Sequence, residues 1–140
     1  MKQQQKHTLG KLERLKSRKL IDLLFKNGKS FNLFPFRVIY MLNYLDVVTE
    51  NELLKAGFSV SKRNFKKAVH RNRIKRLMRE NYRLQKMELK NMLHKEHNNL
   101  AVFILYNGKE LPEYDFVNEK MQLIINKLYK IANEKNIANI

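Results

Sequence analysis

A long amphipathic segment in the middle of the sequence limits the possible folds of this chain more than any other feature. Its apolar residues are spaced three and four positions apart: Ile74, Leu77, Met78 and Tyr82. This spacing predicts an α-helix over roughly residues 65–94, with these side chains inside an arc of about 160°. One side of the helix must therefore pack against the rest of the protein, while the other side faces a different partner.

The other side of this predicted helix carries charge of only one sign. Between Lys62 and Arg79 there are nine Lys or Arg residues, one His and no acidic residue. Like charges three or four residues apart weaken a helix unless an anion compensates them. Arginine presents a planar fork that matches a phosphate group, and the N-terminus of a helix also attracts anions. The segment therefore predicts a nucleic-acid surface, with a merely solvated helix face as the alternative.

The charge of the whole chain is concentrated in the same region. The 140 residues carry 29 Lys or Arg and 13 Asp or Glu, a formal net charge of +16. Residues 62–90 contain twelve basic and two acidic side chains, whereas residues 91–140 contain six of each. A concentrated basic block favours nucleic acid over an anionic membrane. RNA bound through shape and backbone fits better than DNA, since no helix-turn-helix partner or dimerising zipper precedes the segment.

Several classes of function are disfavoured by what the sequence lacks. The absence of cysteine excludes disulfides, thiolate zinc sites and cysteine nucleophiles. No apolar run approaches the roughly eighteen residues that span a bilayer, and the N-terminus lacks the apolar core of a secretory signal. We therefore expect a cytoplasmic protein without a membrane partner. His94 and His97 are only a weak metal candidate, and the carboxylates show no paired spacing, so no catalytic or metal-binding residue is predicted.

The remaining patterns predict an α+β protein. A first helix is expected over residues 17–26, between a capping Ser17 and a terminating Gly28. Strands are expected at residues 37–42, at 56–61 and, buried in mid-sheet, at 100–106, with an uncertain further stretch at 47–49. A last amphipathic helix is expected from about Pro112. Helices packed against one sheet give a two-layer sandwich.

The sequence contains no internal repeat and no linker rich in glycine or proline. Four Gly and two Pro are too few to separate two domains. We therefore expect a flexible basic N-terminus at residues 1–10, a single RNA-binding α+β domain at 11–135 and a C-terminal tail at 136–140.

Two stretches resemble a known family. They are residues 57–62, GFSVSK, and residues 68–80, AVHRNRIKRLMRE. Together they resemble the signature of the bacterial ribonuclease P protein family, whose RNR motif on a long helix is matched by Arg71-Asn72-Arg73. The resemblance extends over about residues 11–132. It implies a central four-stranded sheet in the order αβββαβα, with a left-handed βαβ crossover similar to domain 2 of ribosomal protein S5.

The resemblance also implies a function. Members are subunits of an endoribonuclease that removes the 5′ leader from precursor tRNA and leaves a 5′-phosphate on the mature tRNA. Catalysis resides in the partner RNA, which holds most of the Mg²⁺, and the protein is expected to be monomeric within the ribonucleoprotein. The alternative is a structural RNA-binding protein of the ribosomal type with the same fold. A self-sufficient nuclease is a more distant alternative.

Two binding surfaces follow from the family. The residues implied to bind the catalytic RNA are Lys66, Lys67, Arg71, Asn72, Arg73, Lys75, Arg76 and Arg79. The residues implied to line a cleft for the single-stranded leader are Arg14, Ile21, Phe25, Phe36, Tyr40 and Lys62. Aromatic rings in a basic groove stack on unpaired bases without reading their sequence. Ordinary core packing is the alternative for Phe25 and Tyr40.

Overall fold

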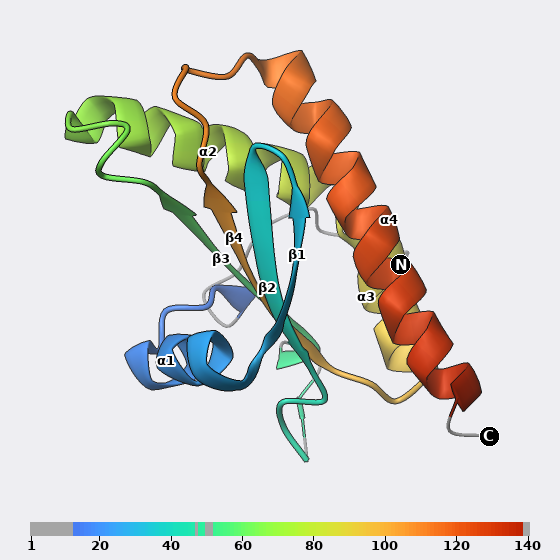
Figure 1. Cartoon of the computed structure of the whole chain (residues 1–140). Coiled ribbons are helices and arrows are strands. Elements are labelled where there is room, and N and C mark those ends of the chain that lie inside the picture. The colour runs from blue at the N-terminus through green and yellow to red at the C-terminus, as the bar shows by residue number, and fades with distance from the viewer. Residues whose placement is uncertain (1–12, 47, 50–51, 139–140) are drawn as a thin grey trace, which may run out of the picture.

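Helices cover both faces of a four-stranded sheet in the computed structural model, which describes residues 13–46, 48–49 and 52–138 (Figure 1). The described elements are α1 (Arg18–Asn27), β1 (Lys29–Leu33), β2 (Phe36–Leu42), β3 (Leu54–Val60), α2 (Ala68–Gln85), α3 (Met87–Lys95), β4 (Leu100–Tyr106) and α4 (Tyr114–Ala138). The predicted α+β architecture and the four-stranded sheet are confirmed. Among the described residues, no helix has the length and apolar character needed to cross a membrane.

The strand that the sequence predicted in mid-sheet lies there. The strand order is β1-β2-β4-β3, so β4 pairs with β2 on one side and with β3 on the other. The β1–β2 and β2–β4 pairs are antiparallel, whereas β3 and β4 are parallel. Parallel neighbours need a crossover connection, and α2 and α3 supply it. The left-handed sense of this crossover stays a prediction from the family resemblance.

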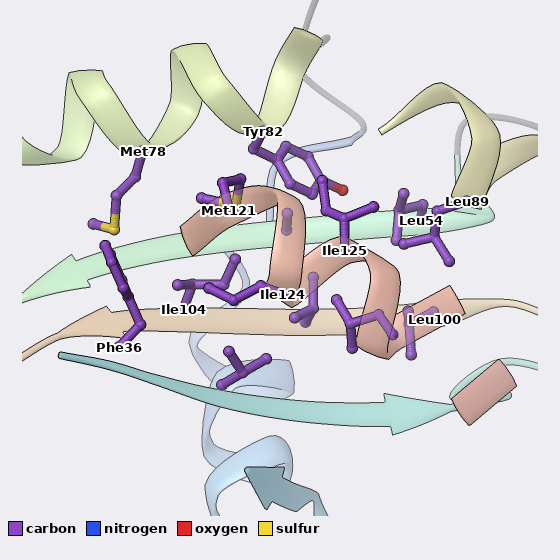
Figure 2. Packing of buried hydrophobic residues seen from close by; sticks show 14 of the residues in the cluster. Phe36, Leu54, Met78, Tyr82, Leu89, Leu100, Ile104, Met121, Ile124 and Ile125 are labelled. Atoms are coloured by element: carbon purple, nitrogen blue, oxygen red, sulfur yellow. The ribbon is translucent and has the colours of Figure 1, made fainter. Parts of the chain in front are cut away.

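The larger core lies between one face of the sheet and helices α2, α3 and α4. Figure 2 shows Ile104 and Phe36 from the strands opposite Met78 of α2 and Met121 of α4. Side chains from the same face of β3 complete this core, because Phe58 and Val60 both contact it as their alternation predicted. Burial of this apolar surface is the main force that holds α2 against the sheet.

Helix α1 covers the opposite face of the sheet. Its Leu24 is fully buried with Ile39 of β2 and Phe103 of β4. Both predicted caps are confirmed: the Ser17 hydroxyl accepts a hydrogen bond from the Leu20 N–H at 3.2 Å, and Gly28 follows the last residue of the helix. A side chain at position 28 would meet a carbonyl oxygen of the preceding helical turn at 2.5 Å, which explains the glycine.

The structure also differs from the sequence prediction in several elements. The long helix is two helices, α2 and α3, which are joined at Lys86. Strand β1 was not predicted, because its exposed polar residues leave only Phe31 and Leu33 to contact the core. Val48 and Thr49 are not in a strand, while Val47 of the same predicted stretch lies outside the described residues.

The domain boundaries remain partly predictions. The predicted flexible N-terminus at residues 1–10 lies outside the described part of the chain. The boundary predicted at residue 135 falls inside α4, since this helix continues to Ala138.

Candidate nucleic-acid interface

Helix α2 has the two sides that its sequence predicted. Ile74, Met78 and Tyr82 are fully buried against the sheet and α4. The side chains on the opposite side are exposed and polar: Asn72, Arg73, Arg76 and Arg79. No acidic residue lies in the first turn of the helix, and its N-cap residue makes no capping hydrogen bond through its side chain. The positive end of the helix is therefore available to an anion.

The first arginine of the RNR motif has a structural role that the sequence did not reveal. One terminal nitrogen of Arg71, Nη1, donates hydrogen bonds to the carbonyl oxygens of Phe65 and Lys66, each at 2.8 Å. These contacts hold the loop before α2 against the first turn of the helix. The neighbouring Lys66 and Lys67 side chains are exposed beside it. Arg71 therefore shapes the entrance to the helix, whereas Arg73 points its charge outward.

The surface predicted for the leader begins at α1. The Phe25 side chain is 50% exposed, and its ring stands edge-on to that of Phe103, with 5.6 Å between the ring centroids. Ile21, one turn earlier, packs against the same small core. An exposed aromatic ring over a face of the sheet is suited to stacking on a base.

The prediction that Phe36 and Tyr40 share a cleft with Phe25 is wrong. Phe36 is 1% exposed and packs against Tyr106 in the larger core, where the ring centroids are 5.2 Å apart. Tyr40 contacts the same core, 5.9 Å from the ring of Phe31. Side chains alternate along a strand, so these residues face α4 while α1 covers the other face. The residue of β2 that packs on the α1 side is Ile39, one position before Tyr40.

The sequence did not reveal which residues lie on the face of the sheet that α1 covers. Arg37 of β2 pairs with Leu105 of β4, which in turn pairs with Ser59 of β3. Paired residues lie on the same face, and Leu105 packs against the α1 core, so this row belongs to the surface that contains Phe25. The Arg37 side chain is exposed. The row of Arg37, Leu105 and Ser59 can be recognised only from the register of the three strands, because the residue pattern of a single strand does not show it.

The two predicted surfaces meet at the β3 edge of the sheet. Arg14, assigned to the leader, and Arg79, assigned to the catalytic RNA, line one hollow together with Lys16. The backbone of Arg14 forms a parallel bridge with Ala56, which brings this segment onto the outer edge of β3. Lys62 is exposed shortly after β3 ends. Cations from the segment before α1 and from α2 therefore lie close together at this edge of the sheet.

Comparison with known proteins identifies the family to which this arrangement belongs. A family model described as Ribonuclease P matches residues 9–129. The chain belongs to the ribonuclease P protein family. A ribonuclease P protein component from Porphyromonas gingivalis strain W83 is 39% identical over 114 residues, which cover 81% of this chain and 81% of that protein. One from Chlorobium phaeobacteroides is 30% identical over 129 residues, with 87% and 88% covered.

Solved structures of ribonuclease P proteins share the fold. The protein from Thermotoga maritima is 25% identical with a TM-score of 0.62, and the match covers 82% of this chain and 96% of that one. A 2.0 Å structure of the Staphylococcus aureus protein is 26% identical with a TM-score of 0.54, covering 86% and 94%. Membership of the ribonuclease P protein family implies partnership with ribonuclease P RNA.

The described residues also bear on metal binding. They include no group of three or more His, Cys, Asp or Glu side chains that could hold a metal ion together. His94 and His97 are both exposed, near the end of α3. The prediction that the partner RNA holds most of the Mg²⁺ stays a prediction.

Proposed function

We propose that this chain is the protein subunit of a ribonuclease P, with the catalytic RNA bound along α2 and the 5′ leader of precursor tRNA bound on the α1 side of the sheet. The observation that carries the proposal is the exposed cationic side of α2 in a chain of this family. Bidentate guanidinium–phosphate contacts give affinity without dependence on sequence.

The leader surface rests on a second set of residues. Phe25 offers a half-exposed ring, and Arg37 places a cation on the same face of the sheet. Stacking on an aromatic ring contributes about 1–3 kcal/mol per base and tolerates any base. Such tolerance suits a subunit that must accept the different leaders of many precursor tRNAs.

The chemistry of cleavage is assigned to the RNA partner. Mg²⁺ bound to the RNA would activate the water that hydrolyses the phosphodiester bond, which would leave a 5′-phosphate on the mature tRNA. The described residues of the protein gather no ligand set for such an ion. We assign substrate affinity and neutralisation of phosphate charge to the protein. We place the complex in the cytoplasm with one copy of the protein per catalytic RNA.

Cleavage assays with the purified protein test this function. Precursor tRNA is incubated with the protein alone, with the cognate catalytic RNA alone, and with both, at low Mg²⁺. We expect no cleavage by the protein alone and faster cleavage by the RNA when the protein is present. Cleavage without the RNA would indicate a self-sufficient nuclease. A protein that bound RNA but failed to stimulate it would fit a purely structural role.

A further inference from the structure

A partly buried carboxylate anchors the segment that precedes α1. The Lys86 ammonium donates to one oxygen of Glu13, and the Lys90 ammonium lies 3.5 Å from the other. The Lys86 side chain is 1% exposed and that of Glu13 is 12% exposed. Burial lowers the pKa of Lys86, and the contact with Glu13 opposes this shift. Glu13 is therefore paired with two lysines at the junction between α2 and α3.

Three consecutive residues of this segment attach to three different parts of the molecule. Glu13 pairs with Lys86 at the helix junction, and Arg14 forms a backbone bridge to Ala56 on the edge of β3. The N–H of Leu15 donates to the Ala56 carbonyl at 2.9 Å, and its side chain is buried in the α1 core. The backbone of Arg14 is thus fixed from both sides.

The Arg14 side chain lines a hollow made by sequence-distant residues. Arg79 from α2 and Lys16 contribute the other charged groups, and Gly57 contributes backbone from β3. No acidic residue is among the described residues that line it, since Glu13 is paired with the lysines instead. Two arginines and a lysine around one hollow have the chemistry of a phosphate site.

We infer that this hollow binds one backbone phosphate of RNA and that Glu13 is a positioning residue, which holds Arg14 opposite Arg79 through its pair with Lys86. This inference rests on the proposed function, since it names one contact within the proposed RNA surface. A buried ion pair adds little net stability compared with apolar packing, but it fixes one geometry. Glu13 acts on the RNA only through the placement of Arg14.

The first test asks whether Arg14 and Arg79 hold the same phosphate. Holoenzymes are assembled with Arg14→Ala, Arg79→Ala and the double variant, and affinity is measured for precursor tRNA with its leader and for leaderless tRNA. We expect each single variant to weaken binding by about tenfold, which corresponds to one good charged contact. The double variant should lose much less than the product of the two single losses. Independent, multiplying losses would overturn the site.

The second test asks whether Glu13 acts through Arg14. Glu13→Gln removes the charge and keeps the size, and we expect it to weaken binding as much as Arg14→Ala does. The combination of these two changes should be no weaker than either one. Glu119→Gln, at an exposed position on α4, is the matched control and should leave binding unchanged. Unchanged affinity in Glu13→Gln, or a further loss in the combination, would overturn the positioning role.

Further measurements separate this inference from a loss of folding and from the proposed function. Thermal unfolding identifies any variant that fails to fold. Glu13→Asp keeps the carboxylate, and we expect it to recover most of the affinity that Glu13→Gln loses. A loss confined to leader-containing substrate assigns the phosphate to the leader, while an equal loss for both substrates assigns it to the catalytic RNA. A wild-type protein that does not stimulate its RNA would contradict the proposed function itself. If the wild-type protein stimulates its RNA normally but the losses from Arg14→Ala and Arg79→Ala multiply in the double variant, only this inference is contradicted.

Discussion

Two arginines of one short motif have different roles in this structure. The Arg71 guanidinium donates to two carbonyl oxygens of the loop before α2, whereas the Arg73 side chain is exposed. The RNR motif alone does not distinguish the two arginines. Because of these hydrogen bonds, substitution of Arg71 should lower the stability of the protein. Substitution of the exposed Arg73 should instead weaken binding of the RNA partner.

Arg73→Ala should weaken assembly with the catalytic RNA by about 1.5–3 kcal/mol, because it removes a charge-assisted contact to phosphate. Affinity for the RNA is measured over a series of salt concentrations. The slope of log affinity against log salt should decrease by about one phosphate contact. An unchanged affinity and slope would show that Arg73 does not contact the RNA.

Arg71→Ala should lower the free energy of unfolding of the free protein by about 1–3 kcal/mol, since two carbonyl oxygens lose their donor. Urea unfolding monitored by circular dichroism measures this change. Arg76→Ala, on the exposed side of the same helix, is the matched control and should stay within about 0.5 kcal/mol of the wild type. Equal midpoints for the two variants would contradict the structural role of Arg71.

At the scale of elements, the sequence predicted what depends on local periodicity. The two sides of α2 could be predicted from the spacing of its apolar residues, and the buried strand β4 from an uninterrupted run of seven apolar and aromatic residues. The break at Lys86 could not, since neither a proline nor a glycine marks it in the sequence. The face toward which each residue of β2 points also depends on its partners. For this reason the positions assigned to the leader cleft were split between the two faces of the sheet.

Phe25→Ala should weaken binding of leader-containing precursor tRNA by about 1–2 kcal/mol, because one stacking platform is lost. The affinity of leaderless tRNA should stay the same. Both affinities are measured with the assembled holoenzyme, and Tyr40→Phe serves as a control on the opposite face of the sheet. A larger loss in Tyr40→Phe than in Phe25→Ala would place the leader on the α4 side.

At the scale of the whole molecule, residues 62–90 supply +10 of the net charge of +16. Helix α2 and the segment around Arg14 bring cations together at a hollow beside β3, whereas residues 91–140 have no net charge. Closely spaced cations repel one another in the free protein and attract phosphates in the complex. Salt screens both effects.

Added salt should therefore act in opposite directions on the free protein and on its complex. We expect the thermal midpoint of the free protein to rise between about 50 and 200 mM NaCl, while its affinity for the catalytic RNA falls by orders of magnitude. Differential scanning calorimetry and RNA titrations over the same salt series check both trends. A midpoint that fell with salt would mean that repulsion does not limit the stability of this fold.

The position of β4 has a consequence for the order in which the protein folds during its synthesis. Strands β2 and β3 do not pair with each other, and both depend on β4, which is made after α2 and α3. Until residue 106 has left the ribosome, the β1–β2 hairpin and β3 lack their common neighbour. The apolar side of α2 is complete well before the sheet against which it packs. A nascent chain that stops before β4 therefore carries a cationic, amphipathic helix whose apolar side lacks the complete sheet against which it packs.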